Sequence, residues 1–260
     1  MHNFQDTQLY HLISNMRLHG YGDSWTEGQG TTNNRNEWKK HSWLKIVSDK
    51  LNVKSINNGI SGNSNLNIFN KIVDDLIEGK IEKNDIVVIM WSSSLRDLVP
   101  FLPKNEWVSW SIKHLIEYPH KFVESYQSEN EKYNNFLCSF KELYVSNLFN
   151  QNYYNIVNQN YIIFLQKMFD FYEVKYVMCD AFESMIIELN KHDDRLDIID
   201  KKYYWRFGKK TIRDFLNDTN REDIWEHSEN YKDRPTQHPN IHGYKLISDM
   251  LYDFIIKAHY

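Results

Sequence analysis

Residues 85–91 have the sequence Asp-Ile-Val-Val-Ile-Met-Trp, in which one charged residue is followed only by apolar ones. A continuous apolar run of this length, rich in β-branched residues, is typical of a strand that is buried on both faces. Strands of this kind occur in parallel sheets that helices cover on both sides. The segment therefore predicts a strand inside such a sheet.

Segments with the period of helices and of strands alternate on both sides of this run. Further short strands are predicted at 16–21, 53–56 and 174–179, and helices at 37–51, 66–77 and 241–257. The β-α-β-α-β order implies parallel strands, right-handed crossovers and helices on both faces of the sheet. We expect an α/β protein with a mostly parallel, doubly wound sheet, in which a fifth strand is hard to place.

The length of 260 residues suits one large domain, or one domain with a sizeable insertion. The alternation of strands and helices stops between about 99 and 160, where four aromatic residues lie among charged ones: Trp107, Trp110, Tyr118 and Tyr126. We expect a single domain over 1–260 with a helical insertion, or cap, at about 99–160, and helices near 136–149 and 153–172. The aromatic residues suit either the core of this cap or stacking on sugar rings.

Charge and composition exclude several classes of protein. The chain has 31 Lys and Arg residues against 35 Asp and Glu residues, so no positive field favours nucleic-acid binding. A hydrophobic content of 41% is too high for a disordered chain. No apolar stretch is long enough to span a bilayer, and the first residues lack the apolar run of a signal peptide, so we expect a cytoplasmic protein. The abundance of Asn, Lys, Ile and Tyr indicates an AT-rich coding genome, such as that of a virus or a low-GC bacterium.

The first polar loop, Gly20-Tyr-Gly-Asp-Ser-Trp-Thr-Glu-Gly28, follows the strand predicted at 16–21. Active sites of open parallel sheets lie at the carboxyl ends of the strands, where Ser24 can point its hydroxyl into the crevice. A dinucleotide fingerprint would need glycine in place of Trp25, and the nucleophile elbow of α/β-hydrolases would need it in place of Thr26. The loop therefore matches neither of those two motifs.

A second polar loop, Asn57-Asn-Gly-Ile-Ser-Gly-Asn-Ser-Asn65, follows the strand predicted at 53–56. Its glycines at 59 and 62 allow tight turns that bring backbone N–H groups close to a ligand, as an oxyanion hole requires. The same residues also suit a capped helix N-terminus, and the two roles are compatible.

His238 is followed by Pro239 and lies just before the predicted C-terminal helix. A histidine held in this way can act as a general base, although a structural role uses the same features. His242 lies four residues further on, but no third ligand accompanies the pair, so we expect no metal and no cofactor. Cys138 and Cys179 are far apart and are expected to be buried, reduced thiols.

Three blocks of sequence together resemble the conserved blocks of the SGNH/GDSL esterase family. They are Gly22-Asp23-Ser24 with Gly28, Asn57-x-Gly59-x-Ser61-Gly62, and His238-Pro239-Asn240-x-x-Gly243-Tyr244, in the same order and with similar spacing. The resemblance runs from about residue 16 to 258 and is weakest at the insertion. It implies a flavodoxin-like, three-layer α/β/α fold and a serine hydrolase that acts on esters, often those of acetylated sugars or lipids.

Carried over residue by residue, the resemblance implies that Ser24 is the nucleophile and His238 its base. The backbone N–H groups of Ser24 and Gly62 would donate hydrogen bonds to the oxyanion. Asp23 and Asn63, which adjoin these residues, are expected to contact the substrate.

The chain departs from the family pattern in two places. After the third strand the family offers an oxyanion-binding Asn, whereas this chain has Trp91-Ser-Ser-Ser-Leu-Arg96. Ser93 lies nearest the Asn position and is the expected donor, with Ser92 or Arg96 as alternatives, and Trp91 and Arg96 are also expected at the substrate. The family's Asp stands where this chain has Pro235, so Asp233 is expected to orient His238, unless a backbone carbonyl does so.

The sequence thus predicts a single-domain serine esterase that hydrolyses short-chain O-acyl esters of small molecules or carbohydrates through an acyl-enzyme. Two other functions stay open. One is carbohydrate binding without catalysis by a descendant of the fold, and the other is transfer of the acyl group to an alcohol.

Overall fold

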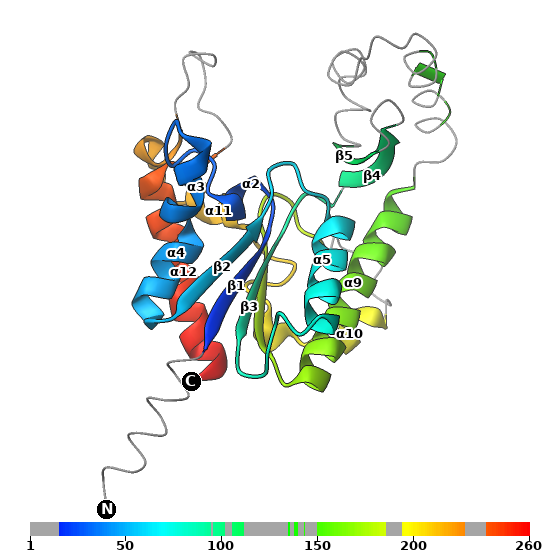
Figure 1. The fold of residues 1–260 in the computed structure, drawn as a ribbon. Helices are drawn as coiled ribbons and strands as arrows, with labels where there is room; N and C mark the ends of the chain where they lie inside the picture. The colour runs from blue at the N-terminus through cyan, green and yellow to red at the C-terminus, as the bar shows by residue number, and fades with distance from the viewer. Residues whose placement is uncertain are drawn as a thin grey trace, which may run out of the picture.

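The fold was derived from a computed structural model of the chain. The structure describes residues 16–94, 96–101, 106–111, 135, 138, 139, 143, 150–185, 194–226 and 238–260. The described elements form three layers, in which a parallel sheet lies between helices on either side (Figure 1). This arrangement confirms the predicted three-layer α/β/α fold.

The described sheet contains four parallel strands in the spatial order β2-β1-β3-β6. Their bounds are Arg17–Gly22 (β1), Lys54–Gly59 (β2), Ile86–Trp91 (β3) and Lys175–Asp180 (β6). β3 is buried along its whole length, as its apolar sequence predicts. The chain moves from β1 to one side of the sheet and then returns to the other side of β1, so the crevice at this reversal of strand order lies beside the carboxyl end of β1.

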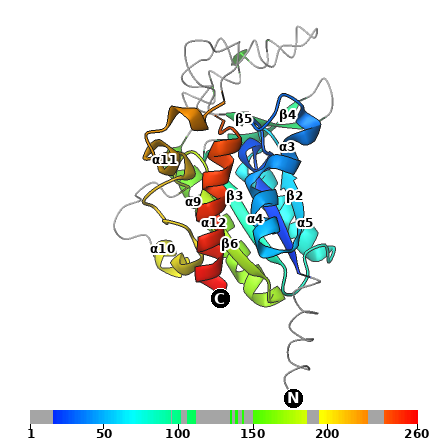
Figure 2. The same ribbon diagram turned by 90° about the vertical axis from the view of Figure 1, so that its left-hand side faces the viewer.

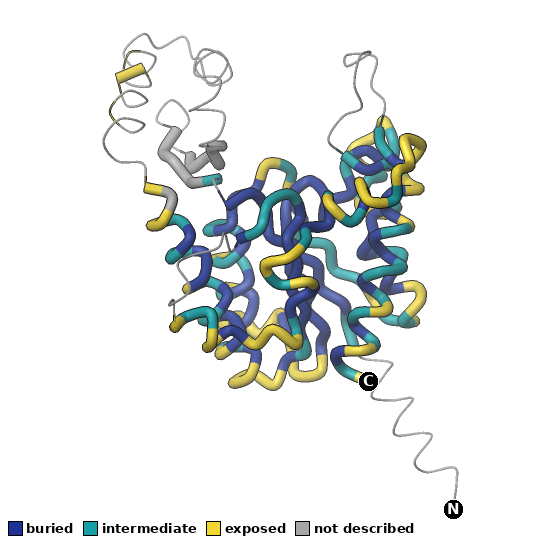
Figure 3. The backbone as a smooth tube through the Cα atoms, turned by 180° about the vertical axis from the view of Figure 1, so that it is seen from behind, coloured by how far each residue is buried: buried dark blue, intermediate teal, exposed yellow. Residues whose placement is uncertain are grey.

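Four long helices cover the two faces of the sheet. α4 (Trp43–Leu51) and α12 (Ile241–His259) pack on one face, and α5 (Asn65–Ile77) and α9 (Gln151–Tyr172) on the other. Figure 2 shows α4 and α12 in front of the strands. Successive residues of β3 alternate between the two cores: Val88 lies in the α4–α12 cluster, and Val87 in the α5–α9 cluster. β1, β3 and β6 are therefore largely buried, whereas the edge strand β2 is mostly only partly buried. Figure 3 shows the buried strands in dark blue.

The other helices whose bounds the structure describes are short. They are α2 (Ser24–Glu27), α3 (Arg35–His41), α10 (Arg195–Ile198), α11 (Ile212–Asn217) and two 3₁₀ turns, η3 (Lys201–Tyr203) and η4 (Glu222–Ile224). The single helix predicted at 37–51 is in fact α3 and α4, because Ser42 between them is extended, with φ −68° and ψ 159°. The break lets α4 bury Trp43 and Leu44 while no residue of α3 is buried.

The region predicted as an insertion contains a β-hairpin in its described part. β4 (Arg96–Phe101) and β5 (Glu106–Ser111) pair in antiparallel fashion, apart from the main sheet. The helix predicted at 153–172 is confirmed as α9, which packs against the sheet through Ile162 and Leu165. The first residues of α9 thus overlap the end of the insertion predicted at about 99–160. Most of the helix expected near 136–149, together with Tyr118 and Tyr126, lies outside the described residues, as do the side chains of Trp107 and Trp110.

Beside β6, where a fifth strand would lie, the described chain pairs with the sheet through one isolated bridge. Tyr204 forms an isolated parallel bridge with Met178 of β6, and the backbone N–H of Trp205 donates to the Met178 carbonyl at 2.8 Å. Among the helices that the structure describes, none is long and apolar enough to cross a bilayer.

A buried carboxylate joins the starts of β1 and β3. Asp85 accepts hydrogen bonds from Arg17 Nη2 at 2.6 Å and from the Glu82 backbone N–H at 2.9 Å, and His19 Nε2 lies 3.1 Å away. Burial alone would raise the pKa of Asp85, but the hydrogen bonds from His19 and Arg17 outweigh it and lower the pKa to about 2.

We expect the Asp85→Asn variant to be less stable than the wild type at neutral pH by about 2 kcal/mol, because nearly two pKa units of stabilisation are lost. The folded-state pKa lies below the unfolded-state value, so this stabilisation is present above about pH 4 and disappears as the pH falls towards 2. Urea unfolding of both proteins across this range measures the difference.

The matched control is Asp249→Asn, which removes an exposed carboxylate paired with Lys50. Its effect should stay below about 0.5 kcal/mol, since exposed ion pairs contribute little. A difference between the wild type and Asp85→Asn that is constant down to low pH would contradict the assignment.

Candidate active site

Ser24 lies at the carboxyl end of β1, where the sequence predicts an active loop. β1 ends at Gly22, and Ser24 is the first residue of α2. Asp23 caps this helix, since its Oδ1 accepts from the Trp25 backbone N–H at 3.1 Å. Ser24 is 4% exposed, so its hydroxyl lies in a confined position rather than on an open surface.

His238 reaches this serine from the opposite end of the chain. Its Nε2 lies 3.0 Å from Ser24 Oγ, within hydrogen-bonding distance, although 214 residues separate the two in sequence. The structure thus brings together the two residues that the sequence predicts as nucleophile and base. Their distance and orientation suit removal of the serine proton by the imidazole.

The backbone around His238 is held on both sides. The Glu226 N–H donates to the His238 carbonyl at 2.9 Å, and Trp225 forms a bridge with Pro239. Gly30 lies against the same turn, since a Cβ at Gly30 would lie 2.5 Å from the Pro239 carbonyl oxygen and 3.1 Å from His238 Cβ. Only a glycine permits this close approach, so the loop after α2 fixes the position of the imidazole.

Several groups act on the pKa of His238. Burial lowers the pKa below its usual value, and the positive charge of Arg96 acts in the same direction, whereas the carboxylates of Asp23 and Glu226 oppose the decrease. The imidazole therefore stays neutral to a lower pH than an exposed histidine does. A neutral imidazole is the form that a general base requires.

The loop after β2 lies against the loop after β1. The Ile60 N–H and the Asn63 side-chain amide both donate to the Gly22 carbonyl, at 3.3 and 3.4 Å. Glu27 accepts from the backbone N–H of Ser61 at 2.8 Å. These bonds place Gly62 and Asn63 beside the Asp23–Ser24 turn, as the sequence predicts.

Two backbone donors in these loops are available. Among the described residues, no group accepts a hydrogen bond from the N–H of Ser24 or of Gly62. Gly62 has φ +79°, in the left-handed region that favours glycine, and a Cβ built there would meet nothing within 4 Å. The predicted oxyanion donors are thus free to bind a ligand.

Two residues at and just after the end of β3, Trp91 and Ser93, do not make the contacts that we expected from the sequence. Trp91 is fully buried in the core cluster on the α5–α9 side, so its ring is not presented to a substrate. The Ser93 hydroxyl, which we expected to donate to the oxyanion, donates to Glu183 Oε2 at 3.1 Å. The neighbouring Ser92 hydroxyl donates to Asp23 Oδ2 at 2.8 Å. The Asn65 side chain of α5 holds the backbone of this loop, since it donates to the carbonyls of Ser92 and Ser93 and accepts from the Ser92 N–H.

Arg96 joins the three loops. Its Nη1 donates to Asp23 Oδ2 and to Ser92 Oγ, both at 2.8 Å, and lies 3.5 Å from the Asn63 carbonyl oxygen. The guanidinium carbon lies 5.5 Å from the centre of the Phe182 ring. Arg96, Asp23 and Asn63 are therefore assembled next to Ser24.

Some contributors to the site carry no motif in the sequence. Glu226 influences His238 through its charge, and Phe182 and Trp225 pack their rings on Trp25, with centroids 4.8 and 6.2 Å away. They belong to none of the motif blocks, so motif spacing could not identify them. Asp233, the expected partner of His238, lies outside the described residues, as does Pro235.

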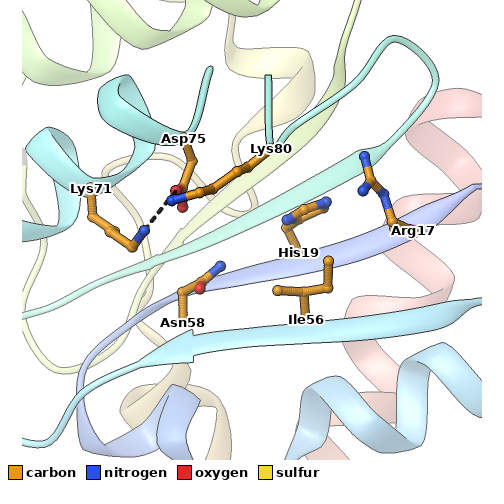
Figure 4. Close-up of a pocket in the computed structure, with 7 residues that line it drawn as sticks. All are labelled: Arg17, His19, Ile56, Asn58, Lys71, Asp75 and Lys80. Carbon is orange, nitrogen blue, oxygen red and sulfur yellow. Dashed lines mark hydrogen bonds and ion pairs between the residues drawn. The ribbon is translucent and has the colours of Figure 1, made fainter. Parts of the chain in front are cut away.

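A separate cavity of about 380 Å³ lies away from Ser24, between the first half of β1, β2 and α5 (Figure 4). Its lining is mostly charged: Arg17, His19, Ile56, Asn58, Lys71, Asp75 and Lys80. Lys71 donates to Asp75 at 2.6 Å, and Asp75 also accepts from the Tyr21 hydroxyl at 2.8 Å. Lys71 and Lys80 both pair with Asp75, and Arg17 pairs with Asp85, so each of these cations already has a carboxylate partner. We therefore place the chemistry at Ser24. In the described part of the chain, no group of three His, Cys, Asp or Glu residues could hold a metal ion.

Comparison with known proteins identifies structural neighbours but no relative by sequence. No protein-family model and no curated protein matches the chain. Among solved structures, the chain is similar to the esterase EstA from Pseudoalteromonas sp. (13% identity, 94% and 98% of the two chains covered, TM-score 0.44). It is also similar to the acetylxylan esterase Axe2 from Geobacillus stearothermophilus (14%, 93% and 94%, TM-score 0.42). A third is a putative lipolytic protein of the G-D-S-L family from Desulfitobacterium hafniense (11%, 92% and 99%, TM-score 0.34). We base the functional proposal on the site itself.

We expect the imidazole of His238 to titrate below the usual histidine pKa of about 6.5. Replacing Glu226 by Gln removes a carboxylate that raises this pKa, so the midpoint should fall further in that variant. NMR titration of histidine-labelled protein gives both values, with the His238 signal assigned by its loss in His238→Gln. A midpoint above 6.5, or an increase in Glu226→Gln, would refute the described electrostatics.

Proposed function

We propose that the protein is a serine esterase in which Ser24 attacks the ester carbonyl and His238 acts as the general base. The observation that supports this most directly is the 3.0 Å separation between Ser24 Oγ and His238 Nε2. A serine hydroxyl is a weak nucleophile at neutral pH, so it needs a base at this distance. The lowered pKa of His238 keeps that base unprotonated near neutrality.

In the first step, the Ser24 oxygen forms a bond to the carbonyl carbon while its proton passes to His238. The carbonyl π electrons move onto the oxygen, where the free N–H groups of Ser24 and Gly62 would stabilise the negative charge. Collapse of this intermediate expels the alcohol, which takes the proton from His238. An acyl group remains on Ser24.

In the second step, His238 removes a proton from water, and the resulting hydroxide attacks the acyl carbon. A second tetrahedral intermediate forms at the same donors and then releases the acid and the Ser24 hydroxyl. No cofactor takes part in either step. In this proposal Asp233, or a backbone carbonyl, orients the second nitrogen of His238, and Glu226 adds a negative charge that favours the imidazolium in the transition state.

We propose further that the acyl group is short and that the alcohol is a small molecule or a carbohydrate. Ser24 is 4% exposed, so little space surrounds the attacked carbon. The half-buried rings of Phe182 and Trp225 pack near it on Trp25 and offer flat apolar faces of the kind that suit a sugar ring.

Ser24→Ala should lower ester hydrolysis by roughly 10⁴-fold or more, because it removes the nucleophile. The same substitution should abolish covalent labelling by a phosphonate, read as a mass increase of the intact protein. Ser48→Ala is the matched control, since this buried serine donates to the Lys45 carbonyl of its own helix, outside the site. It should hydrolyse esters and become labelled as the wild type does.

Unchanged turnover in Ser24→Ala would exclude the proposed nucleophile. Saccharide binding by a wild-type protein that no phosphonate labels would instead indicate a non-catalytic carbohydrate-binding protein. An acylated product that forms only when an acceptor alcohol is added would indicate an acyltransferase.

We expect kcat/KM to fall about tenfold or more between acetyl or butyryl esters and decanoyl esters of the same alcohol, because the confined site excludes long chains. Hydrolysis of a nitrophenyl ester series measures this, and acetylated xylose compared with nitrophenyl acetate tests the carbohydrate. Activity that rises with chain length would contradict the proposed substrate class.

A further inference from the structure

We infer that the Arg96 guanidinium is a catalytic residue of this esterase, which donates the third hydrogen bond to the oxyanion in place of a neutral side chain. The inference rests on the proposed function and adds a residue to its chemistry. It also replaces Ser93, which the sequence favours for this role.

The first argument is the position of the guanidinium. Nη1 contacts Asp23, which directly precedes Ser24, and lies 3.5 Å from the carbonyl of Asn63, which directly follows Gly62. The two backbone donors proposed for the oxyanion hole belong to Ser24 and Gly62. Arg96 thus lies between the immediate neighbours of both donors.

The second argument is that part of the guanidinium is anchored and part is free. Nη1 is held by Asp23 and Ser92, whereas Nε and Nη2 find no acceptor among the residues that the structure describes. Arg17 shows the contrast, because its Nε and Nη2 both bind Asp85. In Arg96, the edge formed by Nε and Nη2 has no such acceptor in the described part of the chain. Because Nη1 is anchored, the guanidinium is held in place while this edge remains available to an oxygen of the substrate.

The third argument is that the hydroxyl protons of the competing serines are already donated. Ser93 donates to Glu183, and Ser92 donates to Asp23. Either serine would have to give up a bond to a carboxylate in order to bind the oxyanion. Arg96 needs no such exchange.

The charges around Arg96 favour a role in the transition state. Asp23 is fully buried and compensates the guanidinium in the resting site, and the carboxylates of Glu183 and Glu226 also lie in the region. These negative charges weigh against a substrate that is itself an anion. A neutral ester avoids this repulsion, and its carbonyl oxygen gains negative charge only during attack, when a charged donor binds it more strongly.

The guanidinium donates a hydrogen bond and transfers no proton, because arginine stays protonated throughout. The serine proton goes to His238, and the electron pair of the carbonyl bond goes to the oxygen. The side chain of Arg96 is 23% exposed, so water screens this interaction only in part.

The test compares Arg96→Gln with the wild type. We expect kcat to fall by roughly 10²–10³-fold, the loss that follows removal of one oxyanion donor, with KM changed less than about threefold. A boronic acid, whose tetrahedral adduct with Ser24 mimics the oxyanion, should lose affinity by a similar factor. Added guanidinium should restore part of the activity of Arg96→Ala.

Since Arg96→Gln leaves Asp23 without its partner, Arg96→Lys provides a second variant that keeps the positive charge and lacks the free edge. It should fold as the wild type does, judged by thermal unfolding, and still show a large part of the kcat loss. Arg206→Gln, which removes an exposed arginine outside the site, is the matched control and should keep wild-type kinetics.

Three results would overturn the inference while leaving the esterase proposal intact. They are a kcat loss below about threefold in both Arg96 variants, a loss confined to KM with unchanged boronate affinity, and a 10²-fold kcat loss in Ser93→Ala instead. Absence of hydrolysis and of Ser24 labelling in the wild type would reject the esterase proposal itself.

Discussion

The buried carboxylate of Asp23 is the interaction on which the arrangement of the site depends. Its Oδ1 caps α2 through the Trp25 N–H, and its Oδ2 accepts from Ser92 and Arg96. One fully buried side chain therefore connects the loop after β1, the loop after β3 and the first residue of the β4–β5 hairpin. A buried carboxylate without partners would be costly, so these contacts are needed together.

This constraint also accounts for the arrangement of the loop after β3. Ser92 and Arg96 both donate to Asp23, and Arg96 carries additional donors. The loop backbone is fixed separately by Asn65 of α5. Two separate sets of contacts thus hold this loop in place.

The sequence predicts most of the fold because its signals are local. The apolar run at 85–91 and the helical periods of 66–77 and 241–257 correspond to β3, α5 and α12, whose bounds differ from the prediction by at most two residues. The break at Ser42 escaped prediction because both sides of it have helical period, and only the burial of α4 separates them. The hairpin at 96–111 pairs with itself and contributes nothing to the alternating pattern.

The proposed nucleophile and base of the candidate site could also be predicted, but the contacts that support them could not. Ser24 and His238 follow from the position of two motifs at strand and helix ends, and the structure brings them to 3.0 Å. The direction of the Ser93 hydroxyl and the anchoring of Arg96 depend on Glu183 and Asp23, which are distant in sequence, so no spacing rule contains them. Gly30 and Glu226 likewise act only through tertiary contacts.

The long separation of Ser24 and His238 has a consequence for how the site forms. Because the two residues are 214 positions apart, their contact closes almost the whole chain into one loop, whereas β1, β2 and β3 join through much shorter connections. Closing a loop of that size costs more chain entropy than closing these short ones. The imidazole also depends on the turn that leads into α12, so we expect the nucleophile loop to be in place before its base arrives. Folding intermediates would then be compact yet unable to perform the chemistry, and activity would report the completion of folding.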